Sequence, residues 1–232
     1  MPRIAPFEVP APVVIGEEPL TVAGVVDVAR HGAPVRVAPA AFERVAASRA
    51  LIERLADDPQ PHYGISTGFG ALATTFIAPE RRRQLQASLI RSHAAGTGAE
   101  VEREVVRALM LLRLQTLASG RTGVRPIVVE TYAAMLNAGI TPIVREHGSL
   151  GCSGDLAPLS HVALAAMGEG EVRTAAGERL GNGIFQLLDE RGGAGQPDVV
   201  HGALDHHRVR EVVDVLARAA DVDELGEAGV LG

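Results

Sequence analysis

The sequence predicts a mainly α-helical protein with a few short strands. Apolar residues recur at intervals of three and four along residues 39–55 and 100–118, which places them on one face of a helix. Proline stands at the start of some of these segments and glycine follows their ends, an asymmetry typical of helices. Hydrophobic residues make up 47% of the 232 residues and aromatic residues only 3%, so aliphatic side chains must fill the core.

In the first part of the chain, an extended arm precedes two helices. Residues 1–19 contain five prolines, which disfavour regular helix and sheet. Residues 20–29 predict a short helix and residues 34–37 a short strand. A longer helix begins at Pro39 and ends before the Asp-Asp-Pro-Gln-Pro stretch at 57–61.

Four more helices are predicted up to residue 168. One begins at Pro79, a second covers residues 100–118 with a clear amphipathic pattern, and a third covers residues 127–138. The last is expected to be capped by Asp155, because aspartate is a favoured N-cap residue. It runs through small apolar residues and ends at Gly168.

Composition excludes several functional classes. The net charge of −6, from 22 basic and 28 acidic residues, argues against a nucleic-acid partner. A single cysteine excludes an internal disulfide and fits a reducing compartment. No apolar run has transmembrane length and no signal-peptide core stands at the N-terminus, so we expect a cytoplasmic protein with no membrane partner. His201, His206 and His207 lack a His-Glu-x-x-His pattern or a cysteine partner, so no metal site is expected.

The most informative stretch is Gly-Ser-Leu-Gly-Cys-Ser-Gly-Asp-Leu-Ala-Pro-Leu-Ser-His at residues 148–161. Ser153 is not in a nucleophile elbow, because Asp155 stands where that motif requires glycine. The stretch has no lysine, so it is not a phosphate-binding loop. Two chemistries remain for a loop just before a helix N-terminus. Cys152 could be a reactive thiolate, or the backbone itself could react.

The backbone reaction needs the residues that this loop contains. The amide nitrogen of Gly154 can attack the carbonyl carbon of Cys152 if the turn is compressed, since glycine has no Cβ to prevent the approach. Loss of water then closes a five-membered ring. Loss of the Ser153 hydroxyl leaves an exocyclic methylidene group, which is a strong electrophile.

This stretch resembles the signature of the aromatic amino acid ammonia-lyases, which form a methylideneimidazolone (MIO) from Ala-Ser-Gly. The resemblance implies that Cys152, Ser153 and Gly154 form MIO autocatalytically and that no external cofactor is needed. Cys152 replaces the usual alanine, and only its backbone carbonyl enters the ring. The family is mostly helical and tetrameric, so the resemblance also implies a homo-oligomer, a tetramer in the family, with active sites assembled from several subunits.

A second stretch, His-Tyr-Gly-Ile-Ser-Thr-Gly-Phe-Gly at residues 62–70, also resembles this family. By itself it predicts a loop, and its glycine spacing and lack of basic residues argue against a dinucleotide site. It is similar to the family's Tyr-Gly-(Val/Ile)-(Asn/Ser)-Thr-Gly-Phe-Gly loop. The resemblance implies that Tyr63 is the catalytic base, which removes the substrate β-proton while MIO captures the amino group. It also implies that Gly70 contacts the substrate.

The third point of resemblance concerns the substrate. Ser92 and His93 occupy the pair of positions that lines the substrate pocket in the family. Ser-His resembles the histidine-specific members, whereas phenylalanine- and tyrosine-specific members have Phe-Leu or His-Leu. The implied reaction is the non-oxidative deamination of L-histidine to urocanate and ammonia.

The resemblance fades after residue 170. We therefore expect residues 1–170 to form the N-terminal MIO domain and residues 171–232 to be a divergent, solvated segment. The family's later asparagine, tyrosine and arginine motifs have no counterpart here. Two alternatives stay open: a phenylalanine or tyrosine ammonia-lyase or aminomutase, and a truncated or frameshifted chain without activity.

Overall fold

A computed structural model describes residues 10–151 and 155–181 of the chain. Helices dominate this part, which confirms the predicted fold class. The elements in chain order are β1 (Val13–Ile15), α1 (Val22–Ala29), β2 (Val35–Val37), α2 (Pro39–Asp57), the 3₁₀ turn η1 (Gly70–Leu72), α3 (Pro79–His93), β3 (Thr97–Glu100), α4 (Arg103–Ala118), α5 (Pro126–Asn137), β4 (Thr141–Pro142), β5 (Arg145–His147), α6 (Leu156–Ala166), β6 (Val172–Arg173) and β7 (Arg179–Leu180).

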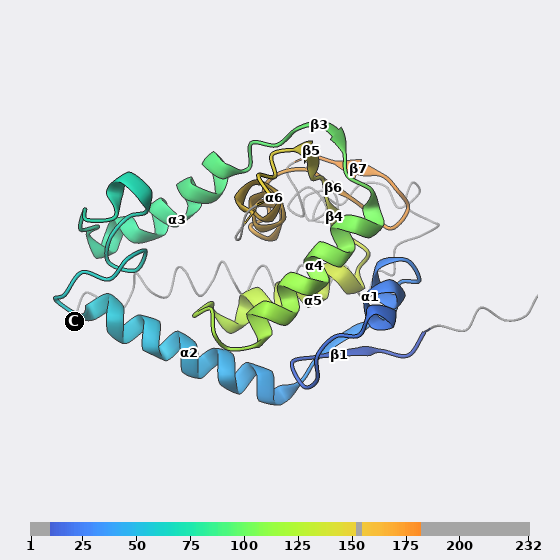
Figure 1. Cartoon of the computed structure of the whole chain (residues 1–232), viewed down its shortest axis with the longest axis horizontal. Coiled ribbons are helices and arrows are strands. Elements are labelled where there is room, and N and C mark those ends of the chain that lie inside the picture. The colour runs from blue at the N-terminus through green and yellow to red at the C-terminus, as the bar shows by residue number, and fades with distance from the viewer. Residues whose placement is uncertain (1–9, 152–154, 182–232) are drawn as a thin grey trace, which may run out of the picture.

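The core lies around α4. In Figure 1, α4 and α5 run side by side, α2 lies against them at an angle, and α1 packs against α4. Aliphatic side chains fill the space between them, as the composition predicts. Those with no exposed surface include Val28, Met110, Leu111, Leu114, Val129 and Met135.

The N-terminal arm contributes a strand to this core. β1 pairs with β2 in parallel, with Val13 opposite Val35. The side chain of Asn137, at the end of α5, accepts from the Val35 amide at 2.7 Å and donates to the Val35 carbonyl at 2.9 Å. This amide thus satisfies the backbone groups of Val35 and ties the strand pair to α5.

A buried arginine joins three helices. Arg107 of α4 is only 2% exposed, and its guanidinium donates to the Val28 carbonyl of α1 at 2.9 Å and to the Leu136 carbonyl of α5 at 3.1 Å. Both carbonyls lie in the last turn of a helix, where backbone acceptors lack partners and partial negative charge collects. Burial, together with the nearby Arg103, lowers the pKa of Arg107 to about 10, so the group stays charged at neutral pH.

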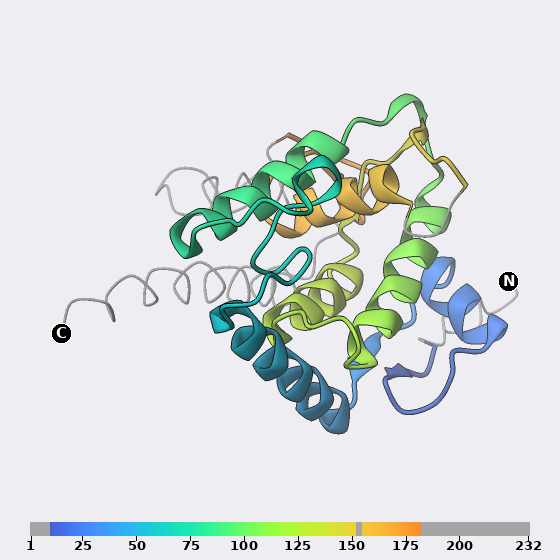
Figure 2. The same cartoon turned by 60° about the vertical axis from the view of Figure 1, so that its left-hand side comes forward.

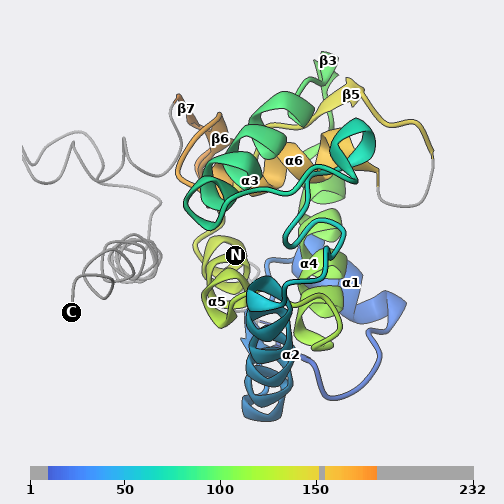
Figure 3. The ribbon, with the colours of Figure 1, turned by 90° about the vertical axis from the view of Figure 1, so that its left-hand side faces the viewer.

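A second group of elements packs at one side of this core. Figures 2 and 3 show α3 lying alongside α6, and α6 in turn contacts α5. None of the residues of α3 is buried. The position of α3 therefore depends on its contacts with α6 and with the loops at its ends.

The predicted helix at 100–118 begins three residues later than expected. Residues Thr97–Glu100 instead form β3, which pairs antiparallel with β5. The Glu100 carboxylate accepts two hydrogen bonds from Arg173 at 2.7 and 2.9 Å, and this pairing is the main reason that the pKa of Glu100 is lowered. The apolar pattern cannot reveal this, because the partner strand lies more than forty residues further along the chain.

Two short strands, β6 and β7, follow residue 170. β6 pairs antiparallel with β4 and β7 with β6, so residues 172–180 extend a sheet that begins at Thr141. Val172 is completely buried in the same core.

We predict that Arg107→Met destabilises the fold by about 2–4 kcal/mol, because it leaves the Val28 carbonyl without its donor and removes one of the donors to the Leu136 carbonyl. Denaturant unfolding followed by circular dichroism measures this change. Arg121→Met is the matched control, since Arg121 is exposed, and its unfolding midpoint should stay within error of the wild type. Equal midpoints for both variants would contradict the role assigned to Arg107.

Candidate functional site

The loop before α6 is closed by Asp155. Its carboxylate accepts a hydrogen bond from the Leu150 amide at 3.1 Å and another from the Ser149 hydroxyl. Asp155 occupies the N-cap position of α6, as predicted, but its side chain makes no capping bond to the helix. The expectation of a side-chain cap is therefore wrong, because the carboxylate is already used by the residues that precede it.

The predicted MIO residues Cys152, Ser153 and Gly154 lie outside the described residues. Their two flanks are described, and Asp155 draws them together. On one flank, the Gly151 amide donates to the Ser149 hydroxyl oxygen at 3.2 Å. The contacts of Asp155 thus join the residue that follows the predicted reactive residues to two residues that precede them.

The backbone at the start of the signature lies very close to the segment that follows α3. A Cβ atom on Gly148 would lie 3.0 Å from the Ala157 Cβ and 3.1 Å from the Gly96 Cα. No larger residue fits at position 148 without displacing one of these neighbours. The start of the signature is therefore packed between α6 and the end of α3.

Tyr63 lies in a tightly hydrogen-bonded loop, as predicted. The His62 carbonyl accepts from the amides of residues 65, 66 and 67 at 3.0–3.2 Å. Ser66 and Thr67, within the loop, are buried. The Tyr63 side chain itself is 64% exposed. Its phenol oxygen accepts from the Gly70 amide at 3.4 Å.

The ring of Phe69 supports this tyrosine. The two rings meet edge to face, with centroids 5.7 Å apart and an interplanar angle of 84°. Gly64 has a φ of +71°, and a Cβ there would lie 2.6 Å from the Phe69 ring. Glycine is therefore required at position 64 both by the backbone conformation and by the ring.

Polar side chains of α3 hold the loop in place. Gln86 contacts the Gly64 carbonyl at 3.5 Å, and Arg82 donates to the carbonyls of Ile77 and Ala56 at 3.0 and 2.8 Å. The Arg82 guanidinium also lies over the Phe76 ring at 5.6 Å. The tyrosine loop (residues 62–70) and α3 are thus joined by direct contacts.

Ser92 and His93 lie at the C-terminal end of α3. The Nδ1 atom of His93 is 2.8 Å from the Leu89 carbonyl oxygen and 3.0 Å from the Ser92 hydroxyl. Because a carbonyl only accepts, Nδ1 carries the proton in the neutral imidazole and Nε2 is left as an acceptor. The pair can therefore present a hydrogen-bond acceptor to a ligand.

α3 thus contacts the predicted base loop through Gln86 and carries the predicted substrate-selecting pair at its C-terminal end. Gln86, which contacts the loop, precedes His93 by two helical turns, or roughly 10 Å of axial rise. Tyr63 makes its polar contact with Gly70, among the described residues, and not with Ser92 or His93. The sequence signals found these positions but missed the tethers of α3, including the ion pair of Arg91 with Glu169.

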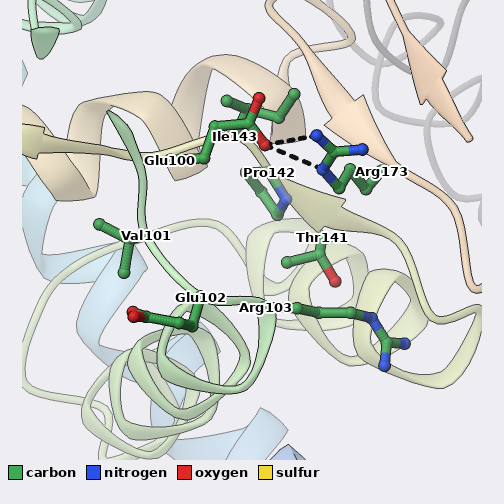
Figure 4. Close-up of a pocket in the computed structure, with 8 residues that line it drawn as sticks. All are labelled: Glu100, Val101, Glu102, Arg103, Thr141, Pro142, Ile143 and Arg173. Atoms are coloured by element: carbon green, nitrogen blue, oxygen red, sulfur yellow. Dashed lines mark hydrogen bonds and ion pairs between the residues drawn. The ribbon is translucent and has the colours of Figure 1, made fainter. Parts of the chain in front are cut away.

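A cavity of about 220 Å³ lies elsewhere, between the start of α4 and the β4–β6 pair. Figure 4 shows Glu100 and Arg173 paired at its edge, with Thr141 and Arg103 nearby. None of the predicted site residues lines it. Within residues 10–151 and 155–181, no cluster of three metal-binding side chains occurs and no helix is long and apolar enough to cross a membrane.

A family model and several known proteins match this chain. A family model described as aromatic amino acid lyase matches residues 20–185. A histidine ammonia-lyase of Streptomyces griseus is 64% identical over 159 residues, which cover 68% of this chain and 31% of that protein. A probable histidine ammonia-lyase of Halobacterium salinarum is 48% identical over 168 residues, which cover 72% of this chain and 32% of that one.

Solved structures share the fold. Tyrosine aminomutase from Streptomyces globisporus matches with a TM-score of 0.71 at 41% identity, over 78% of this chain and 34% of that chain. Histidine ammonia-lyase from Trypanosoma cruzi matches with a TM-score of 0.68 at 31% identity, over 91% and 40%. The chain spans about a third of the length of the sequence relatives named above.

We predict that Asp155→Ala loosens the signature loop, because the Leu150 amide and the Ser149 hydroxyl lose a charged acceptor. Amide hydrogen exchange of residues 149–151 should accelerate about tenfold or more, the loss expected for a hydrogen bond to a charged group. Asp155→Asn keeps an acceptor oxygen and should show a smaller change. Asp57→Ala, at an exposed helix end, is the control. Unchanged exchange in Asp155→Ala would contradict the closure.

Proposed function

Because the chain belongs to the aromatic amino acid lyase family, we propose that it provides the MIO-forming part of a histidine ammonia-lyase. The reaction is the deamination of L-histidine to urocanate and ammonia. The observation that carries the proposal is the 64% identity to a histidine ammonia-lyase over 159 residues, which cover 68% of this chain. The resemblance that the sequence motifs indicate is thus confirmed at the level of the family.

The residues of the signature fit an MIO group. Cys152 supplies the carbonyl, Gly154 the attacking nitrogen and Ser153 the hydroxyl that leaves. The contacts of Asp155 with Ser149 and Leu150 supply a restraint of the kind that compresses a turn. When formed, the group supplies an electrophile for the substrate amino group, and no metal or external cofactor enters the proposal.

We assign proton removal to Tyr63. Its side chain is exposed rather than packed into the core, and its phenol oxygen is oriented by the Gly70 amide and by the Phe69 ring. A group positioned in this way can accept the β-proton of a bound amino acid. Gly70, directly at the phenol oxygen, is assigned to the substrate contact.

We assign the choice of substrate to Ser92 and His93. The Nε2 acceptor of His93 is suited to the N–H of an imidazole side chain, which needs a polar partner once it leaves water. Phenylalanine offers no such donor. Tyrosine aminomutase shares the fold, so an alternative substrate is a phenylalanine or tyrosine side chain, and the Ser92–His93 pair favours histidine over it.

The partner that we propose is a second copy of the chain, within a homo-oligomer. The exposed face of α4 includes Val105 and Leu112, each about half exposed and two turns apart on the same face. Apolar side chains in such positions favour packing against another chain or segment. A tetramer is the assembly that the family resemblance implies.

The test is urocanate formation, measured by its ultraviolet absorbance. Residues 20–185 are placed in the Streptomyces griseus enzyme in exchange for its matching segment, and the product is assayed with histidine. Turnover that is lost on Ser153→Ala supports the proposal. A folded chimera of native oligomeric size that leaves histidine unchanged would contradict it.

We predict that this chain, when folded, shows a mass lower by two water molecules. The reason is that ring closure and loss of the Ser153 hydroxyl each release one. Intact-mass spectrometry measures the difference, and Ser153→Ala should abolish the loss of the second water. Ser160→Ala, a change on the following helix, should retain both losses, whereas an unmodified mass in folded wild-type protein would refute MIO formation.

We predict that Tyr63→Phe slows histidine turnover in the chimera by about 100-fold or more, the usual worth of positioned acid–base catalysis. Tyr132→Phe is the matched control. Tyr132, the other of the two tyrosines, is buried in the core, and burial raises its pKa to about 12. A near-normal rate for Tyr63→Phe would remove this residue from the reaction.

We predict that replacing Ser92 and His93 by Phe and Leu weakens histidine turnover and raises activity on phenylalanine. The reason is that a substrate imidazole left without its partner loses about 1–3 kcal/mol. The ratio of kcat/KM values for the two amino acids, measured in the chimera, checks this. An unchanged ratio would show that selectivity lies elsewhere.

A further inference from the structure

The last residue of the signature, His161, contacts the segment that follows the substrate-selecting pair. The Gly96 amide donates to His161 Nε2 at 3.0 Å, and the two residues are 65 positions apart in the sequence. A Cβ on Gly96 would lie 3.0 Å from this nitrogen and 3.2 Å from the Arg145 Cβ. A larger residue at position 96 would therefore have to displace the imidazole or the Arg145 side chain by a few tenths of an ångström.

The direction of this hydrogen bond determines the state of the imidazole. A backbone amide only donates, so Nε2 must be an unprotonated acceptor and the proton of the neutral ring lies on Nδ1. Protonation of Nε2 would turn the contact into two opposed donors. The Gly96 amide would then be left without this partner.

We propose that His161 is a positioning residue: its neutral imidazole holds residues 92–96, and with them the Ser92–His93 pair, against helix α6. A further polar tether, the ion pair of Arg91 with Glu169, joins α3 to the residues just after α6. That pair is only partly exposed, with two hydrogen bonds between the guanidinium and the carboxylate, and it fixes Arg91 near the last turn of α3. The His161 contact acts beyond the end of α3, on the segment between the Ser92–His93 pair and β3.

The surroundings of His161 favour the accepting state. Partial burial is the main cause that lowers its pKa from the ordinary value near 6.5, and the charge of Arg145 acts in the same direction. Glu171 opposes them, but it forms an ion pair with Arg145 at 3.5 Å. Because the folded-state pKa is lowered, the contact is complete above about pH 6.5 and is lost as the pH falls through the folded value.

The first test uses the chain itself and does not depend on activity. Exchange of the Gly96 amide is followed by NMR between pH 7.5 and pH 5 and is corrected for the intrinsic rate. We expect protection of this amide to fall about tenfold or more with decreasing pH in the wild type. In His161→Phe it should be low at every pH.

His161→Gln provides the matched variant. Its side-chain oxygen can accept from the Gly96 amide but does not titrate, so protection should be restored and independent of pH. His31→Gln, at an exposed position, should behave as the wild type. Wild-type protection in His161→Phe, or the same pH dependence in His161→Gln as in the wild type, would overturn the proposal.

The consequence for the substrate rests on the proposed function. In the chimera, His161→Phe should raise the KM for histidine about tenfold with a smaller change in kcat, and His161→Gln should restore it. Altered Gly96 protection with an unchanged KM would overturn the substrate role. A chimera that is inactive even with His161 present would contradict the proposed function, while the exchange data would still decide the contact.

Discussion

The guanidinium of Arg107 satisfies backbone carbonyls at the ends of two helices, and the arrangement of the core depends on it. Val28 and Leu136 each lie one residue before the end of their helix, where backbone acceptors have no partner in the helix. A cation at that point also matches the partial negative charge of both termini. The aliphatic side chains of α1, α4 and α5 can then pack closely without leaving polar groups unsatisfied.

The candidate site is built on this core but is held by weaker contacts. α3 has no fully buried residue, and yet it contacts the tyrosine loop through Gln86 at its middle and carries the Ser92–His93 pair at its C-terminal end. Its position follows from hydrogen bonds with loops and with α6. An element of this kind can be shifted by small changes in a few polar groups, whereas the aliphatic core cannot.

The signature has two structural functions beside its proposed chemistry. Asp155 gathers the residues before the helix, and His161 holds the end of α3. Neither side chain does what its position in a helix would suggest. Asp155 makes no capping bond, and His161 accepts a hydrogen bond from a segment distant in the sequence. The motif therefore organises its surroundings as well as supplying the reactive residues.

The sequence alone determined the helices and the family. The helices at 20–29, 39–55 and 127–138 follow from local apolar spacing, and the signature at 148–161 is specific enough to identify the family. The tertiary structure decided what depends on distant partners: Glu100 belongs to a strand because Arg145–His147 lies beside it, and His161 meets Gly96 across 65 residues. Local periodicity reports only which residues share a face, and it holds no information about which distant group will complete a hydrogen bond.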